Sequence, residues 1–244
     1  MDKVYSELDE NGKLKNHLLS ALPAKEYQYL LSGLELASLS AGQVLHSPGE
    51  PIEYVYFPNN AIICLVTTME NGSTVESGVV GNEGVVGTAA FMGSDIAYNA
   101  AIVQIAGEAM KIPAVRLKAE FHRGQTLQNL LLRYMQALFI QVSQGAVCNR
   151  LHTIEERFAR WLLMISDRMQ SKELLLTQEF ISHMLGIRRS GVTVAAGTLQ
   201  QAGLISYRRG KITILDRESL ESSACECYRI IKAEFQRLLG VERG

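Results

Sequence analysis

The pattern of hydrophobic and polar positions changes its period twice along the chain. Apolar residues recur at helical spacing between residues 14 and 35, which predicts one or two short helices. Between residues 36 and 113, short apolar runs alternate with turn residues, and Asn71-Gly72 separates two of these runs, as in a β-hairpin. The strands expected here cover residues 54–57, 61–68, 74–80 and 100–107. Short strands at this spacing predict a compact all-β barrel or sandwich.

The helical period returns after Pro113. Residues 125–144 contain neither Gly nor Pro, and their apolar residues fall near heptad spacing, so a long helix is expected there. An apolar stripe of this length favours pairing with a second copy of the chain. Packing against the chain's own β domain would also explain it, and both can hold at once. The residues expected at a homodimer interface are Leu127, Leu131, Tyr134, Leu138 and Gln141.

The last third of the chain carries the signals of a helix-turn-helix. An amphipathic helix is expected over residues 151–168. The next helix begins after Thr177, which is a good N-cap, and ends at Gly186, because glycine favours the left-handed conformation found after a helix C-terminus. A further helix is expected from about residue 188 to residue 202, so that a tight turn joins the two.

This segment is rich in cations and poor in acids. No Asp or Glu lies between Glu179 and Asp216, while the helix expected over residues 188–202 opens with two arginines. Residues 203–214 predict two short strands about a basic glycine turn. A recognition helix contacts base edges with its N-terminal residues, and arginine pairs bidentately with guanine.

Arginine pairs on helices are most often solvated surface, but the order of cap, turn, arginines and basic hairpin together predicts binding to double-stranded DNA. The residues expected to contact DNA are Arg188, Arg189, Ser190, Thr193, Val194, Thr177, Gln178, Arg208, Arg209 and Lys211.

Composition adds a charge asymmetry. Residues 1–150 hold 10 Lys and Arg against 14 Asp and Glu, whereas residues 151–244 hold 14 against 11. The basic half therefore coincides with the expected DNA-binding half. No apolar run is long enough to span a bilayer, and residues 1–16 lack the apolar core of a signal peptide. These features predict a cytoplasmic protein without a membrane partner.

The four cysteines, Cys64, Cys148, Cys225 and Cys227, are scattered and include no C-x-x-C pair. A single final helix is expected after its N-cap, Asp216, and on it residues 225 and 227 would point about 200° apart, which prevents them from sharing a ligand easily. We therefore expect reduced structural thiols, no metal site and no cofactor. The histidines expected at the surface or at helix caps are His17, His46, His122, His152 and His183.

The motifs together resemble the Crp/Fnr (cyclic-AMP receptor-like) family of bacterial transcription regulators, and the resemblance covers nearly the whole chain. Its most specific parts are LTQEFISHMLGIRRSGVTVAAGTLQQAGLISYRRGKITILD (176–216) and ERFARWLL (156–163). PGEP (48–51) and GVVGNEGVVG (78–87) are similar to parts of the family's β-roll.

The resemblance implies an α+β fold in three parts. Residues 1–124 would form a cyclic-nucleotide-binding-like β-roll sensor domain, residues 125–149 a dimerisation helix, and residues 150–244 a winged helix-turn-helix DNA-binding domain. On the family's pattern, Arg189, Ser190 and Val194 occupy the base-reading positions. Ser190 and Val194 replace a glutamate and an arginine of other members, which implies a different target sequence.

An effector pocket in the β-roll is also implied, with Gly81, Asn82, Glu83, Gly84, Val85, Tyr98 and Asn99 as its residues. Cyclic-nucleotide-binding members hold the ring phosphate with a Gly-Glu element followed by an Arg-Ser/Thr-Ala element. The second position here is Tyr98-Asn99-Ala100, which lacks the arginine. Because burying a phosphate without a cation is costly, we expect an effector other than cyclic AMP. A cyclic-nucleotide-responsive regulator is the alternative.

The expected partners are double-stranded DNA, a second copy of the chain, RNA polymerase and a small-molecule effector. An enzyme is disfavoured because the sequence has no Ser/His/Asp order, no paired carboxylates in a turn-rich region and no phosphate loop. A ligand-binding module without a DNA function is the remaining rival, and the C-terminal winged unit argues against it.

Overall fold

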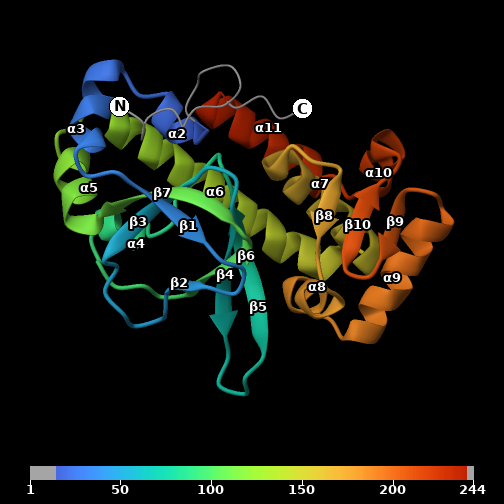
Figure 1. Ribbon diagram of the computed structural model, residues 1–244. Helices are drawn as coiled ribbons and strands as arrows, with labels where there is room; N and C mark the ends of the chain where they lie inside the picture. The colour runs from blue at the N-terminus through green and yellow to red at the C-terminus, as the bar shows by residue number, and fades with distance from the viewer. Residues whose placement is uncertain (1–14, 241–244) are drawn as a thin grey trace.

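The computed structural model describes residues 15–240, which form an α+β fold. Figure 1 shows a roll of β-strands on one side, a C-terminal unit of helices and a small sheet on the other, and a long helix, α6, that runs from the first to the second. Residues 1–14 and 241–244 lie outside the described residues. Most of the N-terminal segment from which a cytoplasmic location is expected is among them.

The β-roll consists of two antiparallel sheets. One has the order β1-β7-β3, formed by β1 (Glu35–Leu39), β7 (Gly107–Pro113) and β3 (Tyr54–Pro58). The other has the order β2-β6-β4-β5, formed by β2 (Val44–His46), β6 (Ala100–Ile105), β4 (Ile62–Thr68) and β5 (Thr74–Val80). The hairpin predicted at Asn71-Gly72 is confirmed, because Thr68 pairs with Thr74 and Gly72 has a φ of +80°.

Short helices close the ends of the roll. They are α2 (His17–Ser20), α3 (Ala24–Leu31), α4 (Ala89–Met92) and α5 (Ala114–Phe121). The buried Asn16 side chain caps α2, and its amide donates hydrogen bonds to the carbonyl oxygens of Pro58 at 2.9 Å and Gly84 at 3.0 Å. One polar side chain therefore fixes the chain start described here to two segments of the roll.

The long helix expected from residue 125 is α6 (Thr126–Leu151). The residues expected at a dimer interface, Leu127, Leu131, Tyr134, Leu138 and Gln141, are instead buried within the single chain. Gln141 donates a hydrogen bond to the carbonyl oxygen of Val79 at 3.1 Å, and a Cβ at Gly78 would lie 3.5 Å from Leu138. These residues therefore make the intrachain contact that the sequence left open as the alternative. The stripe packs on the chain's own β-roll, which removes its apolar side chains from water.

The C-terminal unit begins with α7 (Ile154–Met169), whose N-terminus has a capping box between Thr153 and Glu156. It continues through α8 (Gln178–Leu185) and α9 (Arg189–Gln201). A three-stranded sheet of order β8-β10-β9 flanks these helices, formed by β8 (Glu173–Leu175), β10 (Lys211–Ile214) and β9 (Ile205–Arg208). β9 and β10 are the expected strands about a glycine turn, whereas β8 is too short and too mixed in character to be predicted.

The single final helix expected after Asp216 is wrong. Asp216 does cap a helix, α10 (Arg217–Ser223), but the chain then breaks before α11 (Cys227–Leu239). Cys225 therefore lies in the break and Cys227 in the first turn of α11, so they do not have the opposite orientations of one continuous helix. Both thiols approach Cys148 and His152, so cysteines that are distant in sequence form one cluster. His152 is the C-cap of α6, and its side chain is 15% exposed.

A buried polar network joins the roll, α6 and α7. Arg168 of α7 donates from Nε to Glu83 Oε1 at 2.8 Å, from Nη2 to Gln141 Oε1 at 2.7 Å and from Nη1 to the carbonyl oxygen of Met164 at 2.9 Å. The side chains of Arg168 and Glu83 are 0% and 1% exposed. The ion pair thus fixes the C-terminal unit to the roll at a fully desolvated position.

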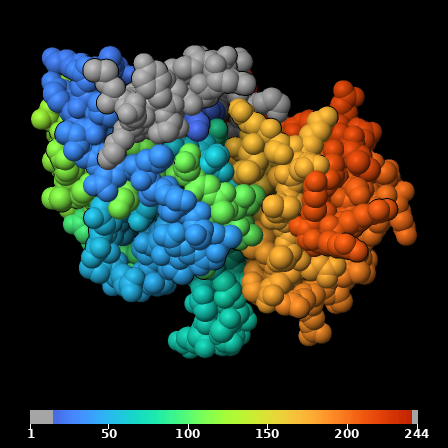
Figure 2. Space-filling view, viewed as in Figure 1, coloured from blue at the N-terminus to red at the C-terminus, as the bar shows by residue number. Residues whose placement is uncertain are grey.

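The β4–β5 hairpin makes a second contact between the units. It projects beside the C-terminal unit in Figure 2, and α8 lies against β5. The Cys64 thiol of β4 is 3.8 Å from the sulfur of Met184 in α8.

Among residues 15–240, no helix combines the length and the hydropathy that crossing a bilayer requires.

Candidate nucleic-acid interface

The first helix of the pair, α8, is held at both ends as the sequence predicts. The Thr177 hydroxyl accepts a hydrogen bond from the N–H of Phe180 at 3.2 Å. Gly186 has a φ of +63° at the C-cap, a conformation that costs glycine little. The next residue, Ile187, packs on the core and donates its N–H to the carbonyl oxygen of Ser182 at 3.0 Å. The turn therefore sets the angle at which α9 begins.

The second helix, α9, has one buried and one exposed face. Val192, Ala195, Ala196 and Leu199 are buried, and the two alanines let the helix approach its neighbours closely. The exposed residues of its first turns include the predicted DNA contacts Arg189, Ser190, Thr193 and Val194, with Arg188 at the N-cap. The exposed face thus presents a guanidinium, two hydroxyls and an apolar side chain, which are the groups that contact base edges in a major groove.

Two contacts link α8 to this exposed face. Arg189 Nη2 lies 2.8 Å from Glu179 Oε2, and both side chains are exposed. Gln178 Nε2 donates to the Thr193 hydroxyl at 3.4 Å. An exposed ion pair contributes only about 0–1 kcal/mol, so Arg189 can leave Glu179 for a better partner at little cost.

The wing is formed by the β9–β10 hairpin. Arg209 and Gly210 have φ values of +50° and +77°, the pattern of a two-residue type I′ turn, which holds Arg208 opposite Lys211. Arg208, Arg209 and Lys211 are all exposed, and Lys211 Nζ lies 2.8 Å from Glu173 Oε1. The turn therefore displays three cations at the tip of a short, rigid hairpin.

Tyr207 connects the wing to both α9 and the sheet. Its N–H donates to Gln200 Oε1 of α9 at 2.8 Å, and its hydroxyl donates to the carbonyl oxygen of Leu176 at 3.2 Å. An open groove of about 490 Å³ separates wing and helices, lined by Thr177, Gln178, Glu179, Arg189, Tyr207, Arg209 and Gly210. Four of the predicted DNA contacts share this groove, and Glu179 is the one acid that lines it.

A second hollow lies between the β-roll and α6. Its volume is about 570 Å³, and Val85, Tyr98 and Asn99 of the predicted effector pocket line it. His46 is the one ionisable side chain apart from the Tyr98 phenol in this lining, and burial lowers its pKa. Burial also corrects the expected place of His46 at the surface. The lining otherwise combines apolar side chains, such as Phe139 and Val142 of α6, with small polar ones.

Gly81, Asn82, Glu83 and Gly84 do not line this hollow, which corrects the predicted pocket. Glu83 is paired with Arg168, and Asn82 Nδ2 lies 3.4 Å from His17 Nε2. Gly84 lies against Tyr134 so closely that a Cβ would come within 2.5 Å of the ring. The residues of this turn therefore form contacts between the β-roll, α6 and α7.

Sequence reasoning missed Met135, Phe139 and Val142 as lining residues, because it assigned a different stripe of α6 to function.

Comparisons with known proteins agree with this architecture. Residues 36–123 match the model of the cyclic nucleotide-binding domain, and residues 156–223 match the model of the Crp-like helix-turn-helix domain. No curated protein sequence matches the chain. A fold with these two parts defines a DNA-binding transcription regulator. The two matches together span well over half of the chain, which belongs to the Crp/Fnr family.

Solved structures share the fold at low sequence identity. A crp/fnr family protein from Eubacterium rectale is 20% identical with a TM-score of 0.66, over 84% of this chain and 96% of that one. FixK2 from Bradyrhizobium japonicum is 17% identical with a TM-score of 0.69, over 79% and 98%. CLP from Xanthomonas campestris, described as a c-di-GMP responsive global regulator, is 15% identical with a TM-score of 0.65, over 80% and 100%.

Proposed function

We propose that this transcription regulator binds an inverted-repeat operator as a homodimer, with α9 in the major groove and the β9–β10 turn on the phosphate backbone. The observation that carries the proposal is the exposed cluster of Arg189, Ser190, Thr193 and Val194 on the first turns of α9, beside the basic turn. Contact with RNA polymerase stays a prediction.

Energetics favour the transfer of Arg189 from protein to DNA. Its ion pair with Glu179 is exposed on both sides and contributes about 0–1 kcal/mol. A bidentate contact with guanine contributes about 1–3 kcal/mol of discrimination. On DNA that offers Arg189 no guanine, Arg189 stays paired with Glu179 and the discrimination energy is not gained.

The test compares two alanine variants on cognate and random DNA over a range of salt concentrations. Arg189→Ala is expected to weaken cognate binding about 5- to 150-fold and to change random DNA binding much less. Arg209→Ala, the matched control in the wing, is expected to weaken binding to cognate and random DNA about equally. It is also expected to reduce the salt dependence of the binding constant by about one phosphate contact per protomer. Equal losses for Arg189→Ala on both DNAs would count against base reading.

The dimer would form through a stripe of α6 that the β-roll leaves open. Leu132, Met135, Phe139, Val142 and Ala146 follow one another at intervals of three and four residues, the spacing of a coiled-coil interface. Leu132 and Phe139 are 51% and 70% exposed in the single chain. Two α9 helices held by this interface would address major grooves about 34 Å apart.

Phe139→Glu tests this interface. The control is Arg133→Glu, which also introduces a glutamate, and changes the charge by two units rather than one, at an exposed position of α6 away from the stripe. We expect Phe139→Glu to give a monomer by light scattering and sedimentation, because a pair of carboxylates would meet at a buried contact. Arg133→Glu is expected to stay dimeric. A dimeric Phe139→Glu variant would rule this interface out.

The hollow between roll and α6 would hold the effector, which we propose is small and uncharged. Neither Arg nor Lys lines it, so a buried phosphate would have no cation partner. Met135, Phe139 and Val142 belong both to its lining and to the proposed dimer interface, so that a ligand could alter how the two copies meet. Cyclic AMP at millimolar concentration is expected to leave the melting temperature unchanged, and a rise of several degrees would favour the cyclic-nucleotide alternative.

A further inference from the structure

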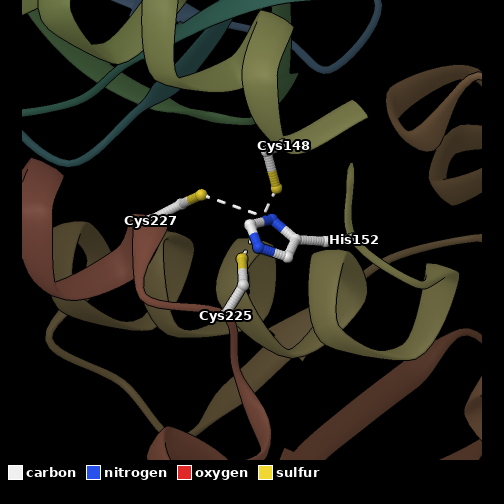
Figure 3. Close-up of side chains that lie close together, drawn as sticks. All are labelled: Cys148, His152, Cys225 and Cys227. Atoms are coloured by element: carbon white, nitrogen blue, oxygen red, sulfur yellow. Dashed lines mark hydrogen bonds between the residues drawn. The ribbon is translucent and has the colours of Figure 1, made fainter. Parts of the chain in front are cut away.

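Three thiols and one imidazole converge where α6 ends. Figure 3 shows Cys148 and His152 from the end of α6 close to Cys225, from the break before α11, and Cys227, from the first turn of α11. The ligand atoms of all four residues lie within 4.8 Å of one another. The three cysteines are buried, and the His152 side chain is 15% exposed. Two distant segments thus bring four metal-binding side chains to one point.

Two of the separations between ligand atoms are close to those around a single tetrahedral ion. With metal–sulfur and metal–nitrogen bonds of about 2.3 and 2.05 Å, tetrahedral zinc places two sulfurs about 3.8 Å apart and sulfur about 3.6 Å from nitrogen. Here Cys148 Sγ is 3.4 Å from Cys225 Sγ, and Cys227 Sγ is 3.5 Å from His152 Nδ1. Iron–sulfur clusters spread their ligands wider than one ion does, so this compact arrangement favours a mononuclear site.

The surroundings orient the ligands as metal sites require. His152 Nε2 lies 3.2 Å from Glu226 Oε2. A carboxylate that accepts a hydrogen bond from Nε2 fixes the tautomer that leaves Nδ1 free to bind a metal. Gln144 Nε2 donates to Cys227 Sγ at 3.3 Å, a hydrogen bond that stabilises a thiolate.

Charge also fits an anionic site. Three thiolates around a divalent cation carry one net negative charge, and the guanidinium groups of Arg157 and Arg160 interact electrostatically with this cysteine cluster. The Nε atoms of both arginines are buried without a hydrogen-bond partner among residues 15–240. Arg160 is buried and Arg157 is half-buried, and Glu76 is a carboxylate close to Arg160. An anionic metal–thiolate centre would balance further positive charge at this position.

We propose that Cys148, His152, Cys225 and Cys227 bind one Zn²⁺ ion in a Cys₃His site. Thiolate and imidazole are the ligands that zinc prefers, and four protein ligands leave no open position, so the site would be structural. Binding would release the thiol protons to solvent as the thiolates form. The ion would tie the end of α6 and its junction with α7 to the start of α11, and so fix the break that separates α10 from α11.

The primary test uses the unmodified full-length protein. Purified under reducing conditions and dialysed, it is expected to contain about one zinc per chain by mass spectrometry of metals. Replacement with Co²⁺ is expected to give thiolate-to-cobalt charge-transfer bands in the near ultraviolet and intense visible bands typical of tetrahedral coordination. Absence of bound metal together with absence of these bands on Co²⁺ addition would overturn the proposal.

Variants then assign the ligands. Cys225→Ser and Cys227→Ser are each expected to lower the affinity for zinc at least 100-fold. Cys64→Ser, which removes the one cysteine outside the cluster, is expected to keep one zinc per chain. His152→Cys is expected to retain zinc in a Cys₄ site with a shifted cobalt spectrum. Glu226→Gln is expected to weaken zinc binding about 10- to 100-fold without changing the stoichiometry. Unaltered zinc content in both serine variants would refute the assignment.

Stability gives a readout that does not depend on the variants. Adding zinc to the metal-free protein at 100 times its dissociation constant is expected to raise the melting temperature by about 5–10 °C, and a chelator reverses the change. The competing outcome is a disulfide between Cys148 and Cys225, whose sulfurs are already adjacent. A disulfide found by peptide mapping in protein that takes up no zinc after reduction would contradict the proposal.

Discussion

The Arg168–Glu83 ion pair predicts the largest single effect on stability in this fold. Replacing Arg168 with Met keeps an unbranched apolar stem but removes the guanidinium and its three hydrogen bonds, to Glu83, Gln141 and the carbonyl oxygen of Met164. The Glu83 side chain, which is 1% exposed, then loses its ion pair with Arg168. The perturbation therefore leaves a carboxylate desolvated at the contact between the β-roll and α7.

The magnitude follows from this geometry. Breaking a buried pair by removing one partner costs about 3–5 kcal/mol, most of it the penalty of the charge left behind. Replacing both partners with apolar residues removes that penalty. The free energy of unfolding of the double variant Glu83→Leu, Arg168→Met is therefore expected to lie within about 2 kcal/mol of that of the original protein. Arg237→Met, which breaks an exposed ion pair with Glu234, is the control and is expected to cost less than about 1 kcal/mol.

Urea unfolding of the four proteins, followed by circular dichroism and by Trp161 fluorescence, measures these differences. Because Arg168 bridges two parts of the chain, its removal is also expected to separate the two unfolding signals. The reasoning would be refuted if Arg168→Met cost less than about 1 kcal/mol, or if the double variant were less stable than the single one.

Two further predictions concern the same contact region. Burial raises the pKa of Glu76 to about 7 from a usual value of 4.5. Between these values the folded state holds a proton that the unfolded state has lost, so stability should fall as pH rises, by at most about 3 kcal/mol. Glu76→Gln should flatten this pH dependence of the melting temperature, and an unchanged slope would refute the assignment. Gly84→Ala should cost about 1–3 kcal/mol in urea unfolding, because its Cβ would lie 2.5 Å from the buried Tyr134 ring. Gly145→Ala on α6, where the added Cβ meets nothing within 4 Å, should cost nothing, and equal losses would contradict the argument.

Local signals explain how much of the fold the sequence predicts. The Asn71-Gly72 hairpin, the Thr177 cap and the Gly186 C-cap depend on a few neighbouring residues, and each is present in the structure. The exposed face of α9 follows from helical periodicity alone. Short strands such as β8 depend on a distant partner, β10, and carry no pattern of their own.

The errors come from long-range packing. The α6 helix has two apolar stripes at similar spacing, and the sequence gives no means of telling which one faces the β-roll. The Gly81–Gly84 turn is rich in glycine, which in the sequence favours a ligand-binding loop, but those glycines permit close contact with Tyr134 and Arg168. The break between α10 and α11 brings Cys225 and Cys227 to Cys148, a contact between segments more than 70 residues apart.

One measurement tests the central claim most directly: selection of binding sites from random double-stranded DNA with the purified protein, followed by sequencing. The account predicts an inverted repeat whose half-sites are centred one helical turn apart, about 10–10.5 base pairs or a multiple of that distance, and whose outer positions lose their preference in Arg189→Ala. Recovery of a single asymmetric motif, or of no enriched sequence at low salt, would contradict it.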